Sequence, residues 1–316
     1  MAAATLGTIL VPLDGSTNAE QALPAAATLA HRGGGALHLV TVHVPVATLL
    51  ASAEEPVANG ELEQELWQEQ ETYLASTAVA VATPHGVEVT HAVVDLHGTV
   101  AKALADHAQA KRVGLVVMTT HGHGGVNRLW LGSVADRILR RVHVPVLLLR
   151  PTEGTLHTEF RRIVVALDGS PEGERALEPA LAVGSLTGAA HYTLVQVVEP
   201  PVPLITRMAM SPARMRPHWR EQQENCARSY LERIGTRLRS QGISVATEMI
   251  AARGVGEQIL GLAQSTGADL IVVGTHAARG MERLLLGSVA DKVIRGASQP
   301  VLVVPTLQEG SHVHDT

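Results

Sequence analysis

The chain has 316 residues, of which 46% are hydrophobic and 17% are charged, and its formal net charge is −5. These values exclude a disordered chain, and the negative net charge argues against a nucleic-acid partner. A single cysteine, Cys226, excludes an internal disulfide framework. No signal-peptide pattern opens the sequence, and histidines and a proline interrupt its longest apolar tract, so we expect a cytoplasmic protein with no membrane span.

Strand and helix patterns alternate along the first half of the sequence. Short β-branched runs predict the strands, and apolar residues at helical spacing predict the helices. The expected strands are 8–12, 36–44, 87–94, 113–120 and 145–150. The expected helices open at Ser16 or Thr17 and stop near the glycines at 33–35, cover 61–83 and 99–110, and follow Gly132. Thr17 and Glu20 have the spacing of a capping box, and Pro84 is expected to end the helix before it.

The second half repeats the first. "TILVPLDGS" (8–16) matches "IVVALDGS" (163–170), and "LWLGSVADRILRRVHVPVLLL" (129–149) matches "LLLGSVADKVIRGASQPVLVV" (284–304). Two distant matches at nearly the same offset predict a duplicated domain. Further expected elements of the second half are strands at 191–198, 243–250, 268–275 and 300–305, a long helix at 213–240 and a helix after Gly256.

This pattern predicts the domain organisation and the fold class. We expect a first domain at 1–150, a linker at 151–161, a second domain at 162–306 and a flexible tail at 307–316. Strands that alternate with helices predict parallel sheets with right-handed crossovers. The expected fold is α/β, with two tandem doubly wound five-stranded parallel sheets and helices on both faces. A ligand crevice is expected beyond the carboxyl ends of the strands in each half.

A Gly-Ser pair opens the last helix of each half. Gly132-Ser133 and Gly287-Ser288 follow a loop that leaves the fourth strand. A helix N-terminus offers unpaired N–H groups, and glycine permits close approach of an anion, so the pair is a candidate phosphate site. The alternative is that both serines are simple N-caps.

An Asp-Gly-Ser turn follows the first strand of each half. Asp14 and Asp168 are candidates to orient the sugar or base of a nucleotide, or a metal on its phosphates. The alternative is that each aspartate satisfies its own turn and the helix that follows. Neither alternative is preferred on sequence alone, and the identity of any metal stays unknown.

Other chemistry finds little support in the sequence. No P-loop is present, and no nucleophile–base–acid set can be recognised. The 16 histidines are interpreted as surface and loop residues, including His121 and His123, because no third metal ligand is evident near them. Cys226 lies within a helix pattern and is expected to be a small buried residue.

Both halves resemble the universal stress protein family in its tandem form, over about 8–150 and 162–305. Nucleotide-binding members of this family carry G-x2-G-x9-G-[ST] after the fourth strand. The first half reads Thr119-x2-Gly122-x9-Gly132-Ser133, and the second half reads Gly274-x2-Ala277-x9-Gly287-Ser288. Each half therefore keeps the x9 spacing and the Gly-Ser pair but has replaced a different glycine.

The resemblance implies a fold with strand order 3-2-1-4-5 and an adenine nucleotide, ATP with or without Mg²⁺, as the ligand. It places Pro12, Asp14 and Asp168 beside the nucleotide, and Val42 and Val197 against adenine. It places the glycine-rich loop around the ribose and phosphates, with the Gly-Ser pairs at the phosphate end. Thr119 brings a side chain close to the ribose, and Ala277 fits only if its φ is negative.

Three functions follow as hypotheses. The first is a stress-response protein that binds ATP as a conformational ligand in at least one half, with little or no hydrolysis, because no catalytic base or arginine finger is evident. The second is a nucleotide-free interaction module. The third is a slow ATPase or another phosphoryl- or adenylyl-transfer enzyme. The resemblance also implies pairing through the fifth strands, within the chain and in a homo-oligomer, since bare apolar edges invite association.

Overall fold

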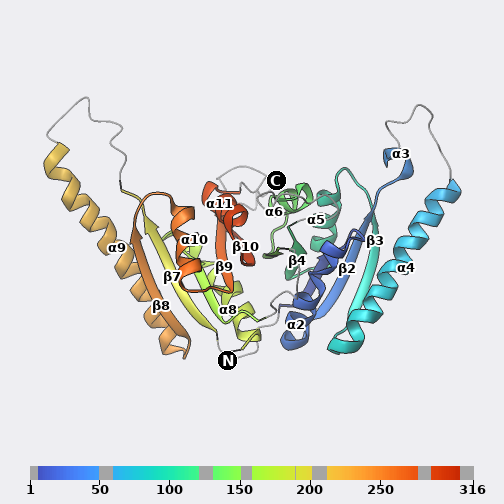
Figure 1. The fold of residues 1–316 in the computed structure, drawn as a ribbon, viewed down its shortest axis with the longest axis horizontal. Helices are drawn as coiled ribbons and strands as arrows, with labels where there is room; N and C mark the ends of the chain where they lie inside the picture. The colour runs from blue at the N-terminus through green and yellow to red at the C-terminus, as the bar shows by residue number, and fades with distance from the viewer. Residues whose placement is uncertain are drawn as a thin grey trace, which may run out of the picture.

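One twisted sheet of ten strands runs through the whole molecule (Figure 1). The computed structural model describes residues 6–49, 60–120, 131–150, 159–188, 190–200, 212–276 and 286–306. The strand order is β3-β2-β1-β4-β5-β10-β9-β6-β7-β8. Each half therefore has the predicted order 3-2-1-4-5, and the α/β fold expected from the sequence is confirmed.

The strands lie close to the positions predicted from the sequence. In the first half they are β1 (Thr8–Pro12), β2 (Ala36–His43), β3 (Val89–Asp95), β4 (Leu115–Thr119) and β5 (Val146–Leu149). In the second half they are β6 (Arg162–Ala166), β7 (His191–Val198), β8 (Ser244–Ala251), β9 (Leu270–His276) and β10 (Val301–Thr306). Strands within a half pair in parallel.

Helices cover both faces of the sheet. The first half has α1 (Thr17–Glu20), α2 (Leu23–Gly33), α3 (Val46–Leu49), α4 (Gly60–His85), α5 (Val100–Ala110) and α6 (Ser133–Leu139). The second half has α7 (Pro171–Glu174), α8 (Leu177–Leu186), α9 (Pro212–Ser240), α10 (Val255–Ser265) and α11 (Ser288–Gly296). Helices α2, α4, α8 and α9 bury residues in one apolar cluster, and α5, α6, α10 and α11 bury residues in a second cluster across the sheet.

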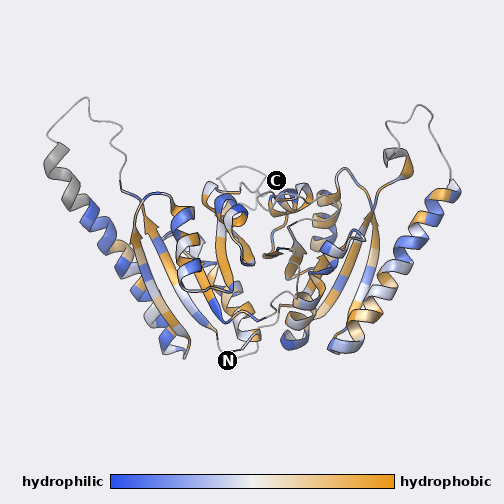
Figure 2. Cartoon of the chain, in the orientation of Figure 1, coloured by the Kyte–Doolittle hydropathy of each residue, from blue (hydrophilic) through white to orange (hydrophobic). Residues whose placement is uncertain are grey.

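The core is aliphatic, as a chain with 2% aromatic residues requires. Valine, leucine, isoleucine and alanine fill both clusters, and Phe160 is the large aromatic residue that is fully buried. The described part of the outer helix α9 is mostly hydrophilic on the side away from the sheet, whereas α4 is hydrophilic mainly in its first half (Figure 2). Among the described residues, no helix is both long enough and apolar enough to cross a membrane.

The two halves meet at an antiparallel seam between β5 and β10. Leu147 and Leu302 lie opposite each other there, and both are fully buried. Arg150 follows β5 and donates hydrogen bonds of 2.8 and 2.7 Å to the carbonyl oxygens of Ile294 and Arg295 at the end of α11. The pairing of the fifth strands within one chain is therefore confirmed, and these two edges are not open to a second chain.

Three local expectations were wrong. The capping box fails because the hydroxyl of Ser16 accepts the N–H of Ala19 at 3.1 Å, which makes Ser16 the N-cap and Thr17 the first helical residue. Helix α4 continues through Pro84 to His85 and ends at Gly86, which has φ of 58°. Pro84 removes one backbone hydrogen bond from this helix, because proline has no N–H to donate. Helix α10 begins at Val255, before Gly256, because Gly254 is the N-cap.

Cys226 is exposed rather than buried. Helix α9 turns another stripe toward the sheet, where Ala227, Leu231, Ile234 and Leu238 are buried. A polar helix of this kind has only one apolar face, so a small residue off that face points to solvent.

Candidate functional site

The candidate site of each half lies where the direction of the chain over the sheet reverses. Helices that follow β1 and β2 pack on one face, whereas helices that follow β3 and β4 pack on the other. Strands β1 and β4 are adjacent and parallel, as are β6 and β9. Their carboxyl ends therefore flank a switch point, the position at which doubly wound sheets bind ligands.

An Asp-Gly-Ser turn leaves β1 at this point. The Oδ1 atom of Asp14 accepts hydrogen bonds from the backbone N–H of Ser16 at 3.0 Å and from its hydroxyl at 2.6 Å. Gly15 has φ of 78°, a left-handed conformation that favours glycine. The second half repeats the turn, with Asp168 Oδ1 accepting from Ser170 at 2.9 and 2.7 Å. The turn role of both aspartates is thus present, and both side chains are exposed at the crevice.

The Gly-Ser pairs open α6 and α11, but the serines are not N-caps. Gly132 and Gly287 are the N-cap residues, with no side-chain capping hydrogen bond, and Ser133 and Ser288 are the first helical residues. Both serine side chains are exposed. The interpretation of both serines as simple N-caps is therefore wrong, because the glycine before each serine occupies the N-cap position.

The N-terminus of α6 is fixed to the end of β4. The N–H of Gly132 donates to the carbonyl of Thr120 at 2.8 Å, and the N–H of Thr120 donates to Leu149 of β5 at 2.8 Å. Thr119 is buried in β4, with 5% of its surface exposed, and Gly274 is the matching residue of β9. Gly122 and Ala277 lie outside the described residues.

The remaining predicted residues lie on the neighbouring strands. Pro12 ends β1 opposite Val40 of β2. Val42 on β2 and Val197 on β7 are partly buried, and both pack against the cluster beneath α5, α6, α10 and α11. The sheet order thus brings together the carboxyl ends of β1, β2 and β4 in the first half, and those of β6, β7 and β9 in the second half.

The donor groups at this edge suit a nucleotide phosphate. Each last helix begins with a glycine N-cap, which has no side chain to cap the first N–H groups, and carries an exposed serine hydroxyl. Such groups are the usual ligands of phosphate oxygens in proteins. Among the residues that the structure describes, no group of three histidine, cysteine, aspartate or glutamate side chains is placed to hold a metal ion.

A buried histidine follows Val42 on β2 and was not among the predicted site residues. His43 ends β2 and is buried, so its interpretation as a surface residue was wrong. Its Nε2 lies 2.6 Å from Oε1 of Glu63, and its Nδ1 lies 2.9 Å from Oε1 of Gln70, both on α4. The other oxygen of Glu63 accepts the N–H of Val46 at 3.0 Å. The hydrogen bond from His43, followed by the one from Val46, lowers the pKa of Glu63.

A second network links the first turn to α4. The hydroxyl of Tyr73 donates to Glu20 at 2.8 Å, and burial together with this bond raises the pKa of Tyr73. Tyr230 is the counterpart on α9, where burial is the main cause of a raised pKa. Each network could have been suspected from the sequence, because a polar residue interrupts a strand or helix face that is otherwise apolar.

The fold is that of a doubly wound α/β protein with a switch point at the carboxyl ends of the strands in each half. The model of the family described as "Universal stress protein family" matches residues 5–150 and 159–305. The chain therefore belongs to the universal stress protein family, with two copies of the domain in tandem.

Relatives of similar length share this arrangement. A universal stress protein from Mycolicibacterium smegmatis is 27% identical over 311 residues, which cover 94% of this chain and 96% of the relative. Universal stress protein Rv1996 from Mycobacterium tuberculosis is 28% identical over 313 residues, covering 95% and 96%. The crystal structure of a universal stress protein from Archaeoglobus fulgidus covers 97% of this chain and 98% of its own, with a TM-score of 0.69 and 19% identity, and so supports the fold.

Proposed function

We propose that this protein binds ATP in one or both halves and uses it as a conformational ligand in a stress response. Asp14 and Asp168 would face the nucleotide, and Val42 and Val197 would meet adenine. Ser133 and Ser288, with the N–H groups of their helices, would hold the phosphates, whose charge Mg²⁺ would balance. Hydrolysis would be slow or absent, and the protein would act in the cytoplasm.

One observation carries this proposal. The two last helices begin at the switch-point edge with a glycine N-cap, no capping side chain and an exposed serine hydroxyl. A helix that needed only structural capping would gain about 1 kcal/mol from a serine at the N-cap position. Glycine at that position instead leaves the first N–H groups open to an anion.

A nucleotide-free interaction module is the second candidate function. It is favoured by Thr119, whose side chain stands where nucleotide-binding relatives carry a glycine, and which is buried in β4. The second half keeps Gly274 at this position and has the longer last helix, of nine residues against seven. If only one half binds ATP, we expect it to be the second.

Native mass spectrometry of the purified chain, with and without Mg²⁺ and ATP, tests the proposal directly. One or two added nucleotide masses per chain are expected. Gly132→Glu and Gly287→Glu, made separately, place a carboxylate at each candidate phosphate position and should each remove the mass bound by that half. The same spectrum reports the oligomeric state, and an oligomer formed through strand edges would have to use β3 or β8.

Gly261→Glu is the matched control. Gly261 is exposed on α10, with nothing within 4 Å of an added Cβ, so this variant adds the same charge away from the crevice. It should bind ATP like the unaltered chain. If the chain stays free of nucleotide at millimolar ATP, the interaction module is the better description. The same holds if the variant with both Gly132→Glu and Gly287→Glu still binds ATP.

A further inference from the structure

The carboxyl end of α11, in the second half, is held by a residue of the first half. Arg150 follows β5, and its Nη2 atom donates hydrogen bonds of 2.8 and 2.7 Å to the carbonyl oxygens of Ile294 and Arg295. The last carbonyl groups of a helix have no partner within the helix, and an arginine can bind them while it balances the negative end of the helix dipole. Arg150 is partly buried at the seam, where a charged donor forms stronger hydrogen bonds than it does in water.

The second half cannot return this contact to α6. Pro305 occupies on β10 the position that Arg150 occupies after β5. Proline has neither a side-chain donor nor a backbone N–H. The two last helices otherwise carry the same internal ion pair, from an aspartate to an arginine four residues later, with 2.9 Å between the arginine Nε and a carboxylate oxygen in each. The seam is therefore asymmetric, although the halves that form it are copies.

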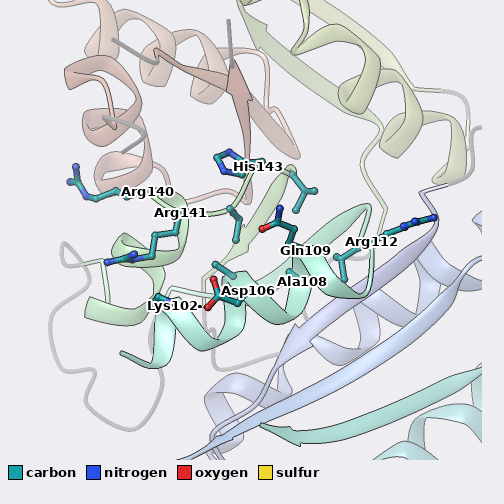
Figure 3. Close-up of a pocket in the computed structure, with 12 residues that line it drawn as sticks. Lys102, Asp106, Ala108, Gln109, Arg112, Arg140, Arg141 and His143 are labelled. Atoms are coloured by element: carbon teal, nitrogen blue, oxygen red, sulfur yellow. Dashed lines mark hydrogen bonds and ion pairs between the residues drawn. The ribbon is translucent and has the colours of Figure 1, made fainter. Parts of the chain in front are cut away.

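Packing around the two helix ends differs in the same direction. Beside the end of α11, Leu260 of α10 packs against Gly296, and its Cδ1 lies 2.5 Å from where a Cβ on that glycine would be. In the first half the matching residues are Ala105 and Arg141, and a cavity of about 370 Å³ lies there between α5 and the segment that joins α6 to β5 (Figure 3). The end of α11 is thus packed by α10 and bound by Arg150, whereas the end of α6 borders a hollow.

The length of the two helices agrees with this difference. Helix α11 has nine residues, and α6 has seven. Ile294 and Arg295 lie in the last turn of α11, whereas the matching Arg140 is already the C-cap of α6. Helix ends fray where their terminal groups lack partners, so a bound last turn keeps the whole helix in place. The start of that helix is Gly287-Ser288, the candidate phosphate site of the second half.

We propose that Arg150 positions the phosphate helix of the second half, so that a residue of the first half sets the ATP affinity of the second. This inference rests on the proposed function, and Arg150 acts through α11 rather than by touching the nucleotide. Its charge neutralises the negative end of the helix dipole and leaves the positive end to face the anion. A helix that is already fixed also loses less freedom when a ligand binds to it. The first half thereby supports the second, with or without a nucleotide of its own.

Titration calorimetry with ATP and Mg²⁺ tests this role in a chain that carries Gly132→Glu, where only the second half is left to bind. In this background Arg150→Met, which keeps a long side chain but has no donor, should weaken ATP binding about three- to tenfold. Arg150→Lys keeps a charged donor and should restore part of the lost affinity. Arg137→Met, a change at an exposed arginine of α6, is the matched control and should leave the affinity as it is.

Amide hydrogen exchange without nucleotide tests the link between Arg150 and α11 by itself. Arg150→Met should speed exchange in residues 291–297 and leave residues 136–142 unchanged, because the lost hydrogen bonds belong to α11 alone. A general loss of stability would speed exchange in both segments.

The outcomes separate this inference from the proposed function. ATP binding that is unchanged by Arg150→Met, or exchange that is unchanged in α11, would overturn the positioning role and leave the proposed function in place. An equal loss of affinity in the Gly287→Glu background, where only the first half is left to bind, would assign Arg150 to the overall fold instead. If exchange responds as expected but the second half binds no ATP, the proposed function fails in that half, and the positioning role fails with it.

Discussion

In the first half of the chain, His38 of β2 and His107 of α5 are hydrogen-bonded to each other, with 2.8 Å between their Nε2 atoms. In the second half, the matching positions hold Thr193 and Leu262. The strands and helices around them have the same order and register in both halves. The same arrangement of strands and helices thus holds a polar pair in one copy and an ordinary strand–helix contact in the other.

The networks next to the crevice differ in the same way. Glu20 accepts the hydroxyl of Tyr73 in the first half. In the second half, Glu174 pairs with Arg233 at 2.9 Å and Arg237 at 3.5 Å, and the hydroxyl of Tyr230 has no partner among the described residues. Apolar periodicity and turn chemistry therefore specify the frame, while the polar groups within it are free to take different roles in each half.

The largest expected effect comes from the seam that the halves share. Leu147→Ala and Leu302→Ala should each lower the free energy of unfolding by about 2–5 kcal/mol, because each removes a fully buried side chain of a cross-strand pair. The two losses should be similar, since the residues face each other across β5 and β10. Urea unfolding followed by circular dichroism measures both.

The shape of the transition is the informative control. If the seam is part of one cooperative core, each variant and the unaltered chain should unfold in a single step. Separate steps for the two halves, or a loss confined to one of the two variants, would mean that each half is stable by itself and that the seam contributes little.

A second prediction concerns the response of the first half to acid. Burial, followed by the charge of His107, lowers the pKa of His38 to about 4. The unfolded chain, with a histidine pKa near 6.5, binds this proton more readily, so the stability from the neutral pair is complete above pH 6.5 and is lost as pH falls toward 4. Between pH 7.5 and 5 the free energy of unfolding should fall on the order of 2 kcal/mol from this site.

His38→Thr/His107→Leu gives the first half the residues of the second and should remove that part of the pH dependence. The comparison is between unfolding free energies at pH 7.5 and 5 for each protein. His97→Thr, a change at an exposed histidine, should leave the dependence as it is. An unchanged slope in the double variant would mean that the pair does not control the acid response.

Much of the frame could be predicted from the sequence. Two repeated segments were enough to recognise the duplication, and the strands were predicted to within two or three residues because each is rich in apolar and β-branched residues. The errors came from competition between neighbouring residues. Ser16 outcompeted Thr17 as the cap, and Pro84 stayed within α4 because it lies in the last turn.

The candidate site could be predicted only in part. The turn aspartates and Gly-Ser pairs were found because a single residue type at one position has a direct backbone consequence. His43 was missed, and so was its bond to Glu63, because the two are 20 residues apart and meet only when α4 packs on β2.

The smallest expected effect comes from Arg112, which has a left-handed backbone at the position where the second half carries Gly267. A non-glycine residue in the left-handed region destabilises the folded chain by about 1–2 kcal/mol. Glycine relieves this strain but also makes the unfolded chain more flexible, which offsets about 0.4–1 kcal/mol of the gain in stability. Arg112→Gly should therefore raise the free energy of unfolding by roughly 0.5 kcal/mol. The reciprocal change, Gly267→Arg, should lower it by about 1 kcal/mol, because Arg162 Nη1 lies 2.8 Å from the position of the new Cβ. Thermal unfolding of the two variants beside the unaltered chain measures both changes. A stability loss in Arg112→Gly would mean that contacts of the Arg112 side chain outweigh the strain of its backbone.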